Sequence, residues 1–326
     1  MELHTCDTKI QRNVPLQDKN WFQTGGAAKF YIKPNSSNEF QAAIRYANAH
    51  NLDLFILGTG ANILIADEGF EGLVIHPNTR KIAHQFCGLD AIVKARAGAT
   101  IDELICYCHD NNITGLEEFS GIPGTIGGAI YINIHYFGFF ISQFLLEATV
   151  INRSNGKIET VEKDWFAFGY DQSKLMSKQY FLLDATFRLK KAGQYETAYA
   201  KGRSVEIIRH RNARYPTSHT CGSFFRNFSE DEVTIKIKGT EKKMIYVAYY
   251  LDKIGIKGNL HVGGAVVSHK HANMIVNTGQ ATASDIINLA SQMQHMVKKE
   301  FGIIPQPECQ LVGFKEYPLC SMSYYF

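Results

Sequence analysis

The chain has 326 residues, of which 45% are hydrophobic and 20% charged, and its formal net charge is +3 at pH 7. This length exceeds what one hydrophobic core usually organises, so we expect two or three subdomains that share interfaces, where ligands commonly bind. The small net charge, carried by lysines and arginines scattered along the chain, argues against a nucleic-acid-binding protein.

The cysteines and the N-terminus indicate the compartment. The seven cysteines are an odd number and include no C-x-x-C pair, which argues against a disulfide framework and a zinc ribbon. The first residues lack a basic stretch followed by an apolar core, and no run approaches the roughly 18 apolar residues of a membrane span. We therefore expect a cytoplasmic protein with no membrane insertion.

The first expected elements are a helix over residues 40–51, a strand over 52–57 and a second strand over 72–76. Between the strands lies a loop of small residues, namely Gly58, Thr59, Gly60, Ala61 and Asn62. The loop has neither the Gly-Lys-Ser/Thr of a Walker A loop nor the third glycine and long helix of a Rossmann fingerprint. Taken alone, the loop favours the interpretation of a tight connection between two strands. The alternative is that its small residues let backbone N–H groups approach a phosphate closely.

A helix over residues 101–111, with Thr100 as its N-cap, precedes a second glycine-rich segment. This segment consists of Gly121, Ile122, Pro123, Gly124, Thr125, Ile126, Gly127 and Gly128. Its glycines and proline make it too irregular for a helix and too rigid for a flexible linker. We expect it to hold one specific backbone shape.

Strands are expected over residues 141–150 and 181–189, and the aromatic residues between them are expected in the core. A basic helix over 203–214 follows a shift in composition near Gly193, where we place the main domain boundary. The C-terminal part is expected to contain, in order, a helix over 246–254, extended segments over 262–267 and 273–277, an amphipathic helix over 282–301 and a last strand over 308–312.

Ser223 and Glu308 are the candidate catalytic residues, as a proton donor and a supporting acid. A serine hydroxyl has no useful acidity in water, so Ser223 is either an ordinary strand residue or part of an electrostatically prepared pocket. His269, Lys270 and His271 lack a third ligand at metal spacing, which favours a structural or substrate-rim role over a metal site.

In their order along the chain, these motifs resemble those of the UDP-N-acetylenolpyruvoylglucosamine reductases, also called UDP-N-acetylmuramate dehydrogenases. The matching segments are residues 20–28, 57–64, 121–128, 221–227, 263–265, 271–273 and 307–308. Each segment is weak evidence alone, but all of them in this order and at this spacing indicate a divergent member of the family.

The resemblance implies an α+β protein with an FAD-binding fold of the vanillyl-alcohol-oxidase (PCMH) type, made of two α/β subdomains and a C-terminal α+β substrate domain. Residues 1–193, split near 75, would bind FAD, and residues 194–326 would bind substrate; whether the last residues pack back on the first region stays open. The residues that would contact FAD are Gly58, Thr59, Gly60, Ala61, Asn62, Gly121, Ile122, Pro123, Gly124, Thr125, Gly127 and Gly128.

The implied reaction is the reduction of an enolpyruvyl ether on a UDP-sugar, in peptidoglycan synthesis, with NADPH first reducing the flavin. Hydride from the flavin would add to the terminal vinyl carbon, and Ser223 would protonate the resulting enolate, with Glu308 as general acid or electrostatic partner. The residues that would bind the nucleotide sugar are Tyr170, Arg211, Arg214 and Asn227. For the two arginines, a solvated basic helix end is the competing interpretation.

The chain departs from the family pattern in three places. Asp171 stands where the family carries an arginine that helps stabilise the enolate, and losing such a group can cost ~3–4 kcal/mol. Residues 133–140, which stand where the family has Asn-Ala-Gly-Ala-Tyr-Gly, are bulkier and more aromatic, and Ala61 replaces a common serine. Ser223 and Glu308 favour the enzyme, whereas Asp171 leaves open a flavin-binding paralogue with lost or altered activity, or an FAD oxidase of the same fold. The sequence indicates neither the oligomeric state nor the preference between NADPH and NADH.

Overall fold

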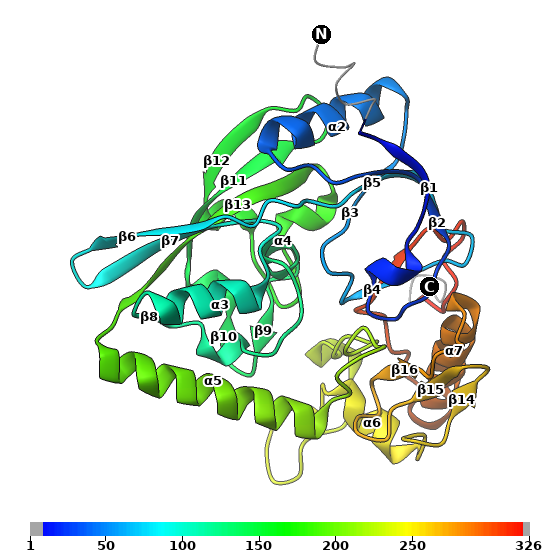
Figure 1. Cartoon of the computed structure of the whole chain (residues 1–326). Helices are drawn as coiled ribbons and strands as arrows, with labels where there is room; N and C mark the ends of the chain where they lie inside the picture. Colours follow the sequence, from blue (N-terminus) through cyan, green and yellow to red (C-terminus); the bar gives the residue numbers. More distant parts are fainter. Residues whose placement is uncertain (1–8, 322–326) are drawn as a thin grey trace. The chain divides into compact units, whose positions relative to one another are not determined.

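The computed structural model describes residues 9–321, and the chain separates into two compact units (Figure 1). The first unit consists of residues up to Val14, Ala28–Thr59 and Glu71–Arg211. The second consists of Pro15–Ala27, Gly60–Phe70 and the residues from Asn212 on. These units are defined by packing alone, so the assignment of residues 1–193 to the cofactor and 194–326 to the substrate stays a prediction.

The first unit contains a four-stranded sheet in the order β1, β2, β5, β3. Its strands are β1 (Gln11–Pro15), β2 (Ala27–Ile32), β3 (Leu54–Ile56) and β5 (Phe70–Ile75). Helix α2 (Ser37–Ala49) buries Phe40, Ile44 and Ala47 with apolar residues of this sheet, because they recur at helical spacing. The predicted helix over 40–51 and the strands over 52–57 and 72–76 are confirmed, with shifted ends.

A larger sheet of the first unit has the order β12, β11, β13, β7, β6, with β8 also paired to β13. Its strands are β6 (Ile82–Cys87), β7 (Asp90–Arg96), β8 (Ile113–Thr114), β11 (Leu145–Asn152), β12 (Ile158–Glu162) and β13 (Tyr180–Lys191), and all pairs are antiparallel. Helices α3 (Ile101–Asp110) and α4 (Ile126–Tyr131) share a core with it. The predicted Thr100 cap is confirmed, since its hydroxyl accepts from the Glu103 N–H.

Three local predictions in this unit were wrong. Residues 141–143 form a 3-10 turn, so the strand starts only at Leu145. The second glycine segment is partly helical, because the Thr125 hydroxyl accepts from the Gly128 N–H and caps α4. The basic helix, α5 (Gln194–Arg214), begins well before residue 203, because Glu196 accepts hydrogen bonds from the Gly193 N–H and from Lys190 at its start.

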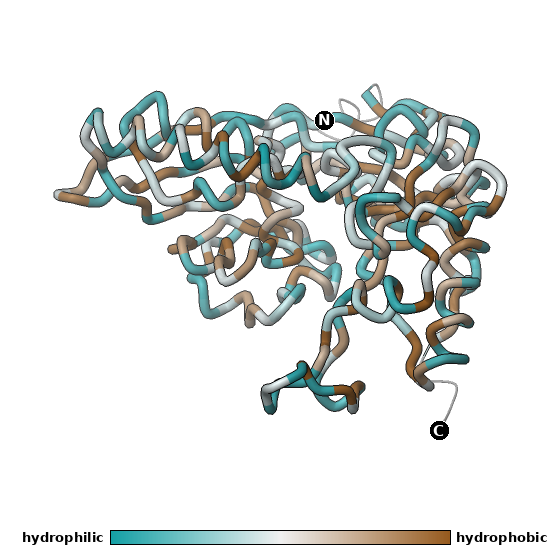
Figure 2. Tube along the Cα trace, turned by 90° about the horizontal axis from the view of Figure 1, so that it is seen from below, coloured by the Kyte–Doolittle hydropathy of each residue, from teal (hydrophilic) through white to brown (hydrophobic). Residues whose placement is uncertain are grey.

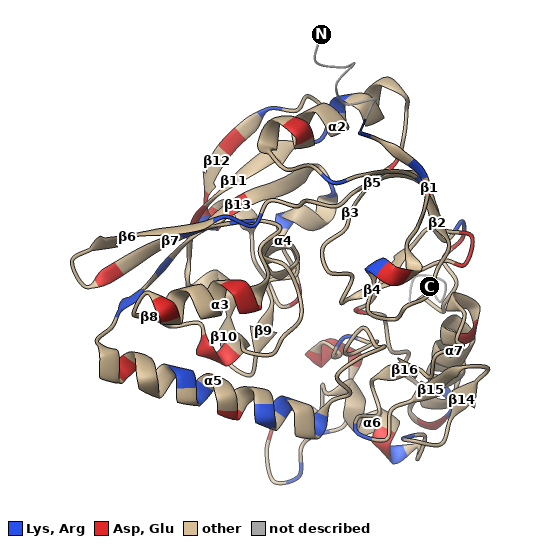
Figure 3. Ribbon diagram, in the orientation of Figure 1, with Lys and Arg blue, Asp and Glu red and all other residues tan. Residues whose placement is uncertain are grey.

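Helix α5 is basic and largely polar. Figure 3 shows lysines and arginines spaced along it. Figure 2 shows that hydrophilic and hydrophobic residues are interspersed along the rest of the chain as well. Arg203 donates two hydrogen bonds to Glu118, at 2.7 and 2.9 Å, which holds α5 to the segment just before the second glycine segment. Neither α5 nor any other helix within residues 9–321 is long and apolar enough to span a membrane.

The second unit combines short strands with two helices around its own core. Strands β14 (His261–Val262), β15 (Ala265–Val267) and β16 (Ile275–Asn277) pair antiparallel, and β4 (Ile63–Ile65) pairs in parallel with β17 (Gln310–Val312). Helices α6 (Val247–Lys253) and α7 (Ala283–Phe301) supply most of the remaining core. The predicted last strand starts only at Gln310, because the N–H groups of Glu308 and Cys309 donate to the Phe224 carbonyl instead.

The start of α7 is held by a residue from a distant part of the sequence. The Asp67 carboxylate accepts hydrogen bonds from the N–H groups of Ala283 and Ser284, at 2.7 and 2.9 Å, and from the Ser284 hydroxyl. Thr282 and Asp285 add a reciprocal capping box at the same end. The turn after β4 is thereby tied to the longest helix of the second unit.

Replacing Asp67 by alanine removes an anionic acceptor from the N-terminus of α7. We expect the free energy of unfolding to fall by about 1–2 kcal/mol, as for other N-cap losses. Urea unfolding followed by circular dichroism measures this change. Glu68→Ala, at the exposed neighbouring position, is the control and should stay within about 0.5 kcal/mol of the parent; equal losses in the two variants would contradict the capping role.

Candidate active site

Ser223 and Glu308 belong to two segments of the second unit that lie side by side. Phe225 pairs antiparallel with Pro307, and the Glu308 N–H donates to the Phe224 carbonyl at 2.9 Å. Both candidate residues are half-buried. Neither lies in a regular strand, so the strand expected to start at Glu308 was wrong at this end, and Ser223 is not an ordinary strand residue; an isolated bridge joins the two segments.

Asn273 holds the Ser223 segment by three hydrogen bonds. Its carbonyl accepts from the Phe224 N–H at 2.8 Å, its amide oxygen accepts from the Phe225 N–H at 3.0 Å, and its amide nitrogen donates to the Phe225 carbonyl at 2.7 Å. All three residues are buried. Sequence reasoning noted Asn273 only as part of a motif and missed this role. The sequence offered one signal for it. An asparagine side chain can donate and accept hydrogen bonds at the same time, and Asn273 opens a segment that was expected to be extended.

The residues after Ser223 are fixed by a partly buried ion pair. Arg226 donates two hydrogen bonds to Glu232, at 2.8 and 2.7 Å. Burial opposes the charge of Glu232, but the hydrogen bonds from Arg226 and Ser229 outweigh it, and the pKa of Glu232 is lowered. Asn227, a predicted substrate residue, accepts from the N–H of Val247 at the first residue of α6. Its substrate role stays a prediction beside this structural one.

Two cysteines flank the candidate pair. Cys221 and Cys309 are both buried and free. Burial, followed by the hydrogen bond with the Cys309 thiol, raises the pKa of Cys221 well above its usual value. A thiol that stays protonated is a poor nucleophile, so the packing role predicted for these two residues fits their surroundings.

The loop over residues 58–62 has the features of a phosphate-binding loop. Within the described chain, none of its backbone N–H groups donates a hydrogen bond. A Cβ at Gly58 would lie 2.7 Å from the Thr125 hydroxyl oxygen, and a Cβ at Gly60 would lie 2.5 Å from the Asn20 Cα. The side-chain oxygen of Asn62 is buried with no hydrogen-bond partner among residues 9–321. Free donors, close backbone approach and an orphaned acceptor fit a phosphate-bearing cofactor such as FAD.

The second glycine segment is rigid, as predicted. The N–H groups of Ile126 and Gly127 donate to the carbonyls of Ala99 and Ala97, at 2.8 and 2.9 Å. Gly121 has a φ of +73°, which favours glycine. Gly58, at the start of the first glycine loop, packs against Thr125 of the second glycine segment, and both residues belong to the first unit. This packing is consistent with a role of both glycine segments in binding the same cofactor.

The two arginines predicted to bind substrate lie in different surroundings. Arg211, in the first unit, donates its Nε–H to the Gly121 carbonyl at 3.2 Å and lies 5.3 Å above the Tyr136 ring. Arg214, in the second unit, lies 5.7 Å above the Tyr215 ring. The structure therefore does not bring Arg211 and Arg214 to one place within a unit, and their substrate role stays a prediction.

Tyr170 and Asp171 lie in a turn of the first unit that packs against the hairpin of β9 (His135–Tyr136) and β10 (Phe139–Phe140). Tyr170 is 50% exposed, and its ring centroid lies 4.5 Å from that of His135. The Asp171 Oδ1 lies 3.3 Å from the His135 Nδ1. Two departures from the family pattern, which sequence reasoning treated separately, are therefore in direct contact.

The cluster at residues 269–271 is built into the second unit. The Lys270 ammonium donates to the Asn212 carbonyl at 2.7 Å, and the His271 ring packs on that of Tyr215 at 5.5 Å. Burial lowers the pKa of His271, which favours the neutral ring. In the part of the chain that the structure describes, no group of three or more His, Cys, Asp or Glu residues could hold a metal ion. These contacts support a structural role.

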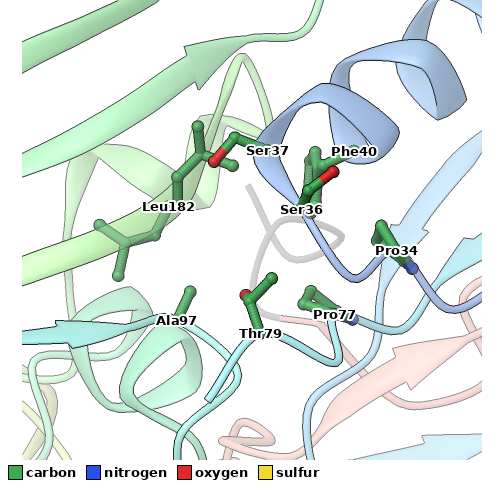
Figure 4. A pocket seen from close by; sticks show the side chains of 9 residues that line it. Pro34, Ser36, Ser37, Phe40, Pro77, Thr79, Ala97 and Leu182 are labelled. Carbon is green, nitrogen blue, oxygen red and sulfur yellow. The ribbon is translucent and has the colours of Figure 1, made fainter. Parts of the chain in front are cut away.

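A small pocket in the first unit lies apart from these residues. Ser36 and Ser37, at the start of α2, face Pro77 and Thr79 across it (Figure 4). Its free volume of about 10 Å³ holds about one water molecule. Because none of the predicted site residues lines it, we assign it no ligand.

The chain matches two family models. Residues 214–312 match the C-terminal domain of UDP-N-acetylenolpyruvoylglucosamine reductase, and residues 28–162 match an FAD binding domain. A UDP-N-acetylenolpyruvoylglucosamine reductase of Synechococcus sp. is 33% identical over 309 residues, which covers 94% of this chain and 95% of the relative. One of Lachnoclostridium phytofermentans is 30% identical over 314 residues, which covers 95% of each chain.

A solved structure shows the same fold. The crystal structure of UDP-N-acetylenolpyruvylglucosamine reductase from Thermus caldophilus matches with a TM-score of 0.73 at 24% identity, covering 93% of this chain and 98% of that one. Together with the FAD binding domain match, this similarity confirms the predicted α+β, FAD-binding fold.

Replacing Gly58 by alanine should disturb both glycine segments, because the added Cβ would displace the Thr125 hydroxyl that caps α4. We expect the purified variant to contain less than about a tenth of the parent's flavin, measured as flavin absorbance per protein, since close backbone approach is lost. Gly202→Ala in α5, where a Cβ meets no atom within 4 Å, is the matched control. Normal flavin content in Gly58→Ala would contradict a cofactor role for this loop.

His271 should make stability depend on pH. Because burial holds its pKa below the usual 6.5, the unfolded chain takes up a proton there before the folded chain does. The contribution of the neutral ring is therefore fully present above about pH 6.5 and is lost as the pH falls below it. The free energy of unfolding should decline less steeply between about pH 6.5 and 5 in His271→Phe than in the parent. Equal slopes in denaturant titrations would contradict this assignment.

Proposed function

This chain belongs to the UDP-N-acetylenolpyruvoylglucosamine reductase family, and we propose that it reduces UDP-N-acetylglucosamine enolpyruvate to UDP-N-acetylmuramate in peptidoglycan synthesis, with FAD as cofactor and NADPH as reductant. The observation that carries this proposal is similarity over 94% of the chain to a relative with this name. The pairing of the Ser223 and Glu308 segments adds support from the structure. We also propose a cytoplasmic location, in line with the odd number of cysteines in the sequence.

We assign FAD binding to the residues of the two glycine segments. These are Gly58, Thr59, Gly60, Ala61, Asn62, Gly121, Ile122, Pro123, Gly124, Thr125, Gly127 and Gly128. The free backbone donors and the orphaned Asn62 oxygen support this assignment. When bound, FAD supplies to the substrate the hydride that it receives from NADPH.

We assign the proton transfer to Ser223. Once hydride has added to the terminal vinyl carbon, the electron pair of the double bond resides on the carbon next to the carboxylate, and this carbon takes the hydroxyl proton. Glu308 serves as general acid or electrostatic partner. Backbone pairing holds both residues, so the orientation that a weakly acidic hydroxyl requires is prepared before substrate binds. The Ser223 hydroxyl makes no hydrogen bond to the described residues, which leaves it available to the substrate.

We assign recognition of the nucleotide sugar to Tyr170, Arg211, Arg214 and Asn227. The half-exposed phenol of Tyr170 and the fork geometry of the two guanidinium groups, which suits a diphosphate, support this assignment. Asp171 is the observation that favours an altered activity, since it places an anion next to Tyr170. A flavin-binding paralogue is therefore the second candidate.

The assay that separates the two candidates uses the purified protein with its bound flavin. We expect NADPH oxidation to accelerate on addition of UDP-N-acetylglucosamine enolpyruvate, with formation of UDP-N-acetylmuramate at one equivalent per NADPH. A flavin-loaded protein whose NADPH consumption is indifferent to this substrate would exclude the reductase and leave the paralogue.

Ser223→Ala should separate the two half-reactions. Reduction of bound flavin by NADPH, followed in a stopped-flow instrument, should stay unchanged, while turnover of the UDP-sugar should fall by about 10²–10⁴-fold, the usual contribution of a general acid. Ser291→Ala on α7 is the control serine and should retain turnover. If Ser223→Ala turns over as fast as the parent, Ser223 is not the proton donor.

A further inference from the structure

Strand β6 is one outer edge of the larger sheet of the first unit, in the β6–β7 hairpin that is drawn in cyan in Figure 1. An edge strand leaves a row of backbone N–H and C=O groups without a neighbouring strand, and such a row is a template for pairing with another chain. Proteins commonly protect this kind of edge with charged residues, proline or a bulge. The other edge of the sheet, β12, follows that pattern, since it carries Glu159 and Glu162.

Strand β6 carries none of these protections. Its sequence, Ile-Ala-His-Gln-Phe-Cys, contains no charged residue and no proline, and its register with β7 continues from Ile82 to Cys87 without a bulge. Four of its six residues are exposed, namely Ala83, Gln85, Phe86 and Cys87. The strand is therefore regular, neutral and accessible, which are the properties of an edge that pairs with another strand.

The ladder with β7 determines which backbone groups of β6 point outward. The Arg96 N–H donates to the Lys81 carbonyl at 3.0 Å, so Lys81 and every second residue after it bond to β7. The N–H and C=O groups of Ile82, His84 and Phe86 therefore point away from β7. In the described part of the chain β7 is the one strand that pairs with β6, so these six groups have no ladder partner.

The side chains of the same three residues lie on one face of the sheet, because alternate residues of a strand point to the same side. The His84 Nδ1 lies 2.8 Å from the Tyr107 hydroxyl of α3, and the His84 ring centroid lies 4.9 Å from that of Phe86. Ile82 packs against the core that the sheet shares with α3. Phe86 is 44% exposed, with the Lys191 ammonium 4.9 Å from its ring centroid. The row is therefore anchored at Ile82 and His84, and Phe86 has apolar surface left to cover.

We propose that β6 pairs antiparallel with the β6 strand of a second copy of this chain, about a two-fold axis at His84. In this register His84 exchanges both hydrogen bonds with the partner's His84, and Ile82 exchanges both with the partner's Phe86, so all of the outward groups are satisfied. The Ile82 side chain then lies beside the partner's Phe86, a β-branched and aromatic pair that is favourable across strands.

A second copy is the occupant that fits this edge. A pairing strand must be uncharged and must place an apolar residue opposite Ile82 and another opposite Phe86, and β6 itself meets both conditions when it runs antiparallel. The two-fold axis closes the assembly at two chains, because each copy has then used its β6 edge. Two six-residue strands make a small interface, so we expect association in the micromolar range.

Sedimentation equilibrium of the purified protein tests the association itself. One chain has a mass of 36.7 kDa. We expect the weight-average mass to rise from this value toward twice this value as the protein concentration is raised from about 1 to 200 µM. A mass that stays at one chain over this range, or one that grows past two chains, would overturn the two-fold pairing.

His84→Lys and His84→Gln are the matched variants of the interface. Both lose the ring contacts with Phe86 and Tyr107, so a loss of folding stability is common to them. Only His84→Lys places two ammonium groups opposite each other at the axis. Its dissociation constant should be about three- to tenfold higher than that of His84→Gln at low salt, and added salt should reduce the difference. Equal dissociation constants in the two variants would contradict pairing at this residue.

Cysteine cross-linking with oxidised glutathione tests the register, with the exposed Cys87 and Cys106 replaced by serine in every variant. His84→Cys should give a disulfide-linked dimer, because the two residues paired at the axis have Cα atoms about 5.5 Å apart, within the range of a disulfide. Gln85→Cys places the two thiols at diagonal positions, with Cα atoms about 7–8 Å apart, and should cross-link at least about tenfold more slowly. Cross-linking of His84→Cys that is no faster than that of Gln85→Cys would overturn the proposal.

Discussion

The backbone pairing of residues 224–226 with residues 306–308 determines where Ser223 and Glu308 lie. Phe225 and Pro307 form an antiparallel β-bridge, and the Phe224 carbonyl accepts a hydrogen bond from the Glu308 N–H. Asn273 satisfies the remaining polar groups of the buried Phe225 backbone, so the segment has no alternative partner to move toward. Because this positioning depends on backbone hydrogen bonds, the place of both residues does not depend on which side chains they carry.

At the two glycine segments, the position of the backbone is fixed by close steric contact instead of by strand pairing. Gly58 touches Thr125, whose hydroxyl caps α4, and the helix begins where Gly127 donates to the Ala97 carbonyl. A side chain at Gly58 would push on a residue that is itself a helix cap. The absence of side chains therefore serves two purposes at once: it lets the chain pack closely and it leaves backbone N–H groups uncovered for a ligand.

Sequence reasoning succeeded where the signal was local. Helix α3 was predicted because its apolar periodicity coincides with a threonine cap that acts within three residues, and α7 was predicted from its apolar periodicity. It failed where a distant partner decides the outcome. The strand expected at residue 308 starts at Gln310, since the N–H groups of Glu308 and Cys309 are taken by the Phe224 carbonyl. This partner, more than 80 residues away, cannot be read from periodicity.

Asp171 also has a partner that is distant in the sequence, so from the sequence alone it was interpreted only as the loss of the family's arginine. Viewed along the sequence, an anion replaces a cation beside a developing negative charge, and the expected consequence is a higher barrier. In the folded chain, the anion lies 3.3 Å from His135, a residue that belongs to another departure from the family pattern. Two departures that lie more than 30 residues apart in the sequence are therefore neighbours in the folded chain, so a substitution at one of them changes the surroundings of the other.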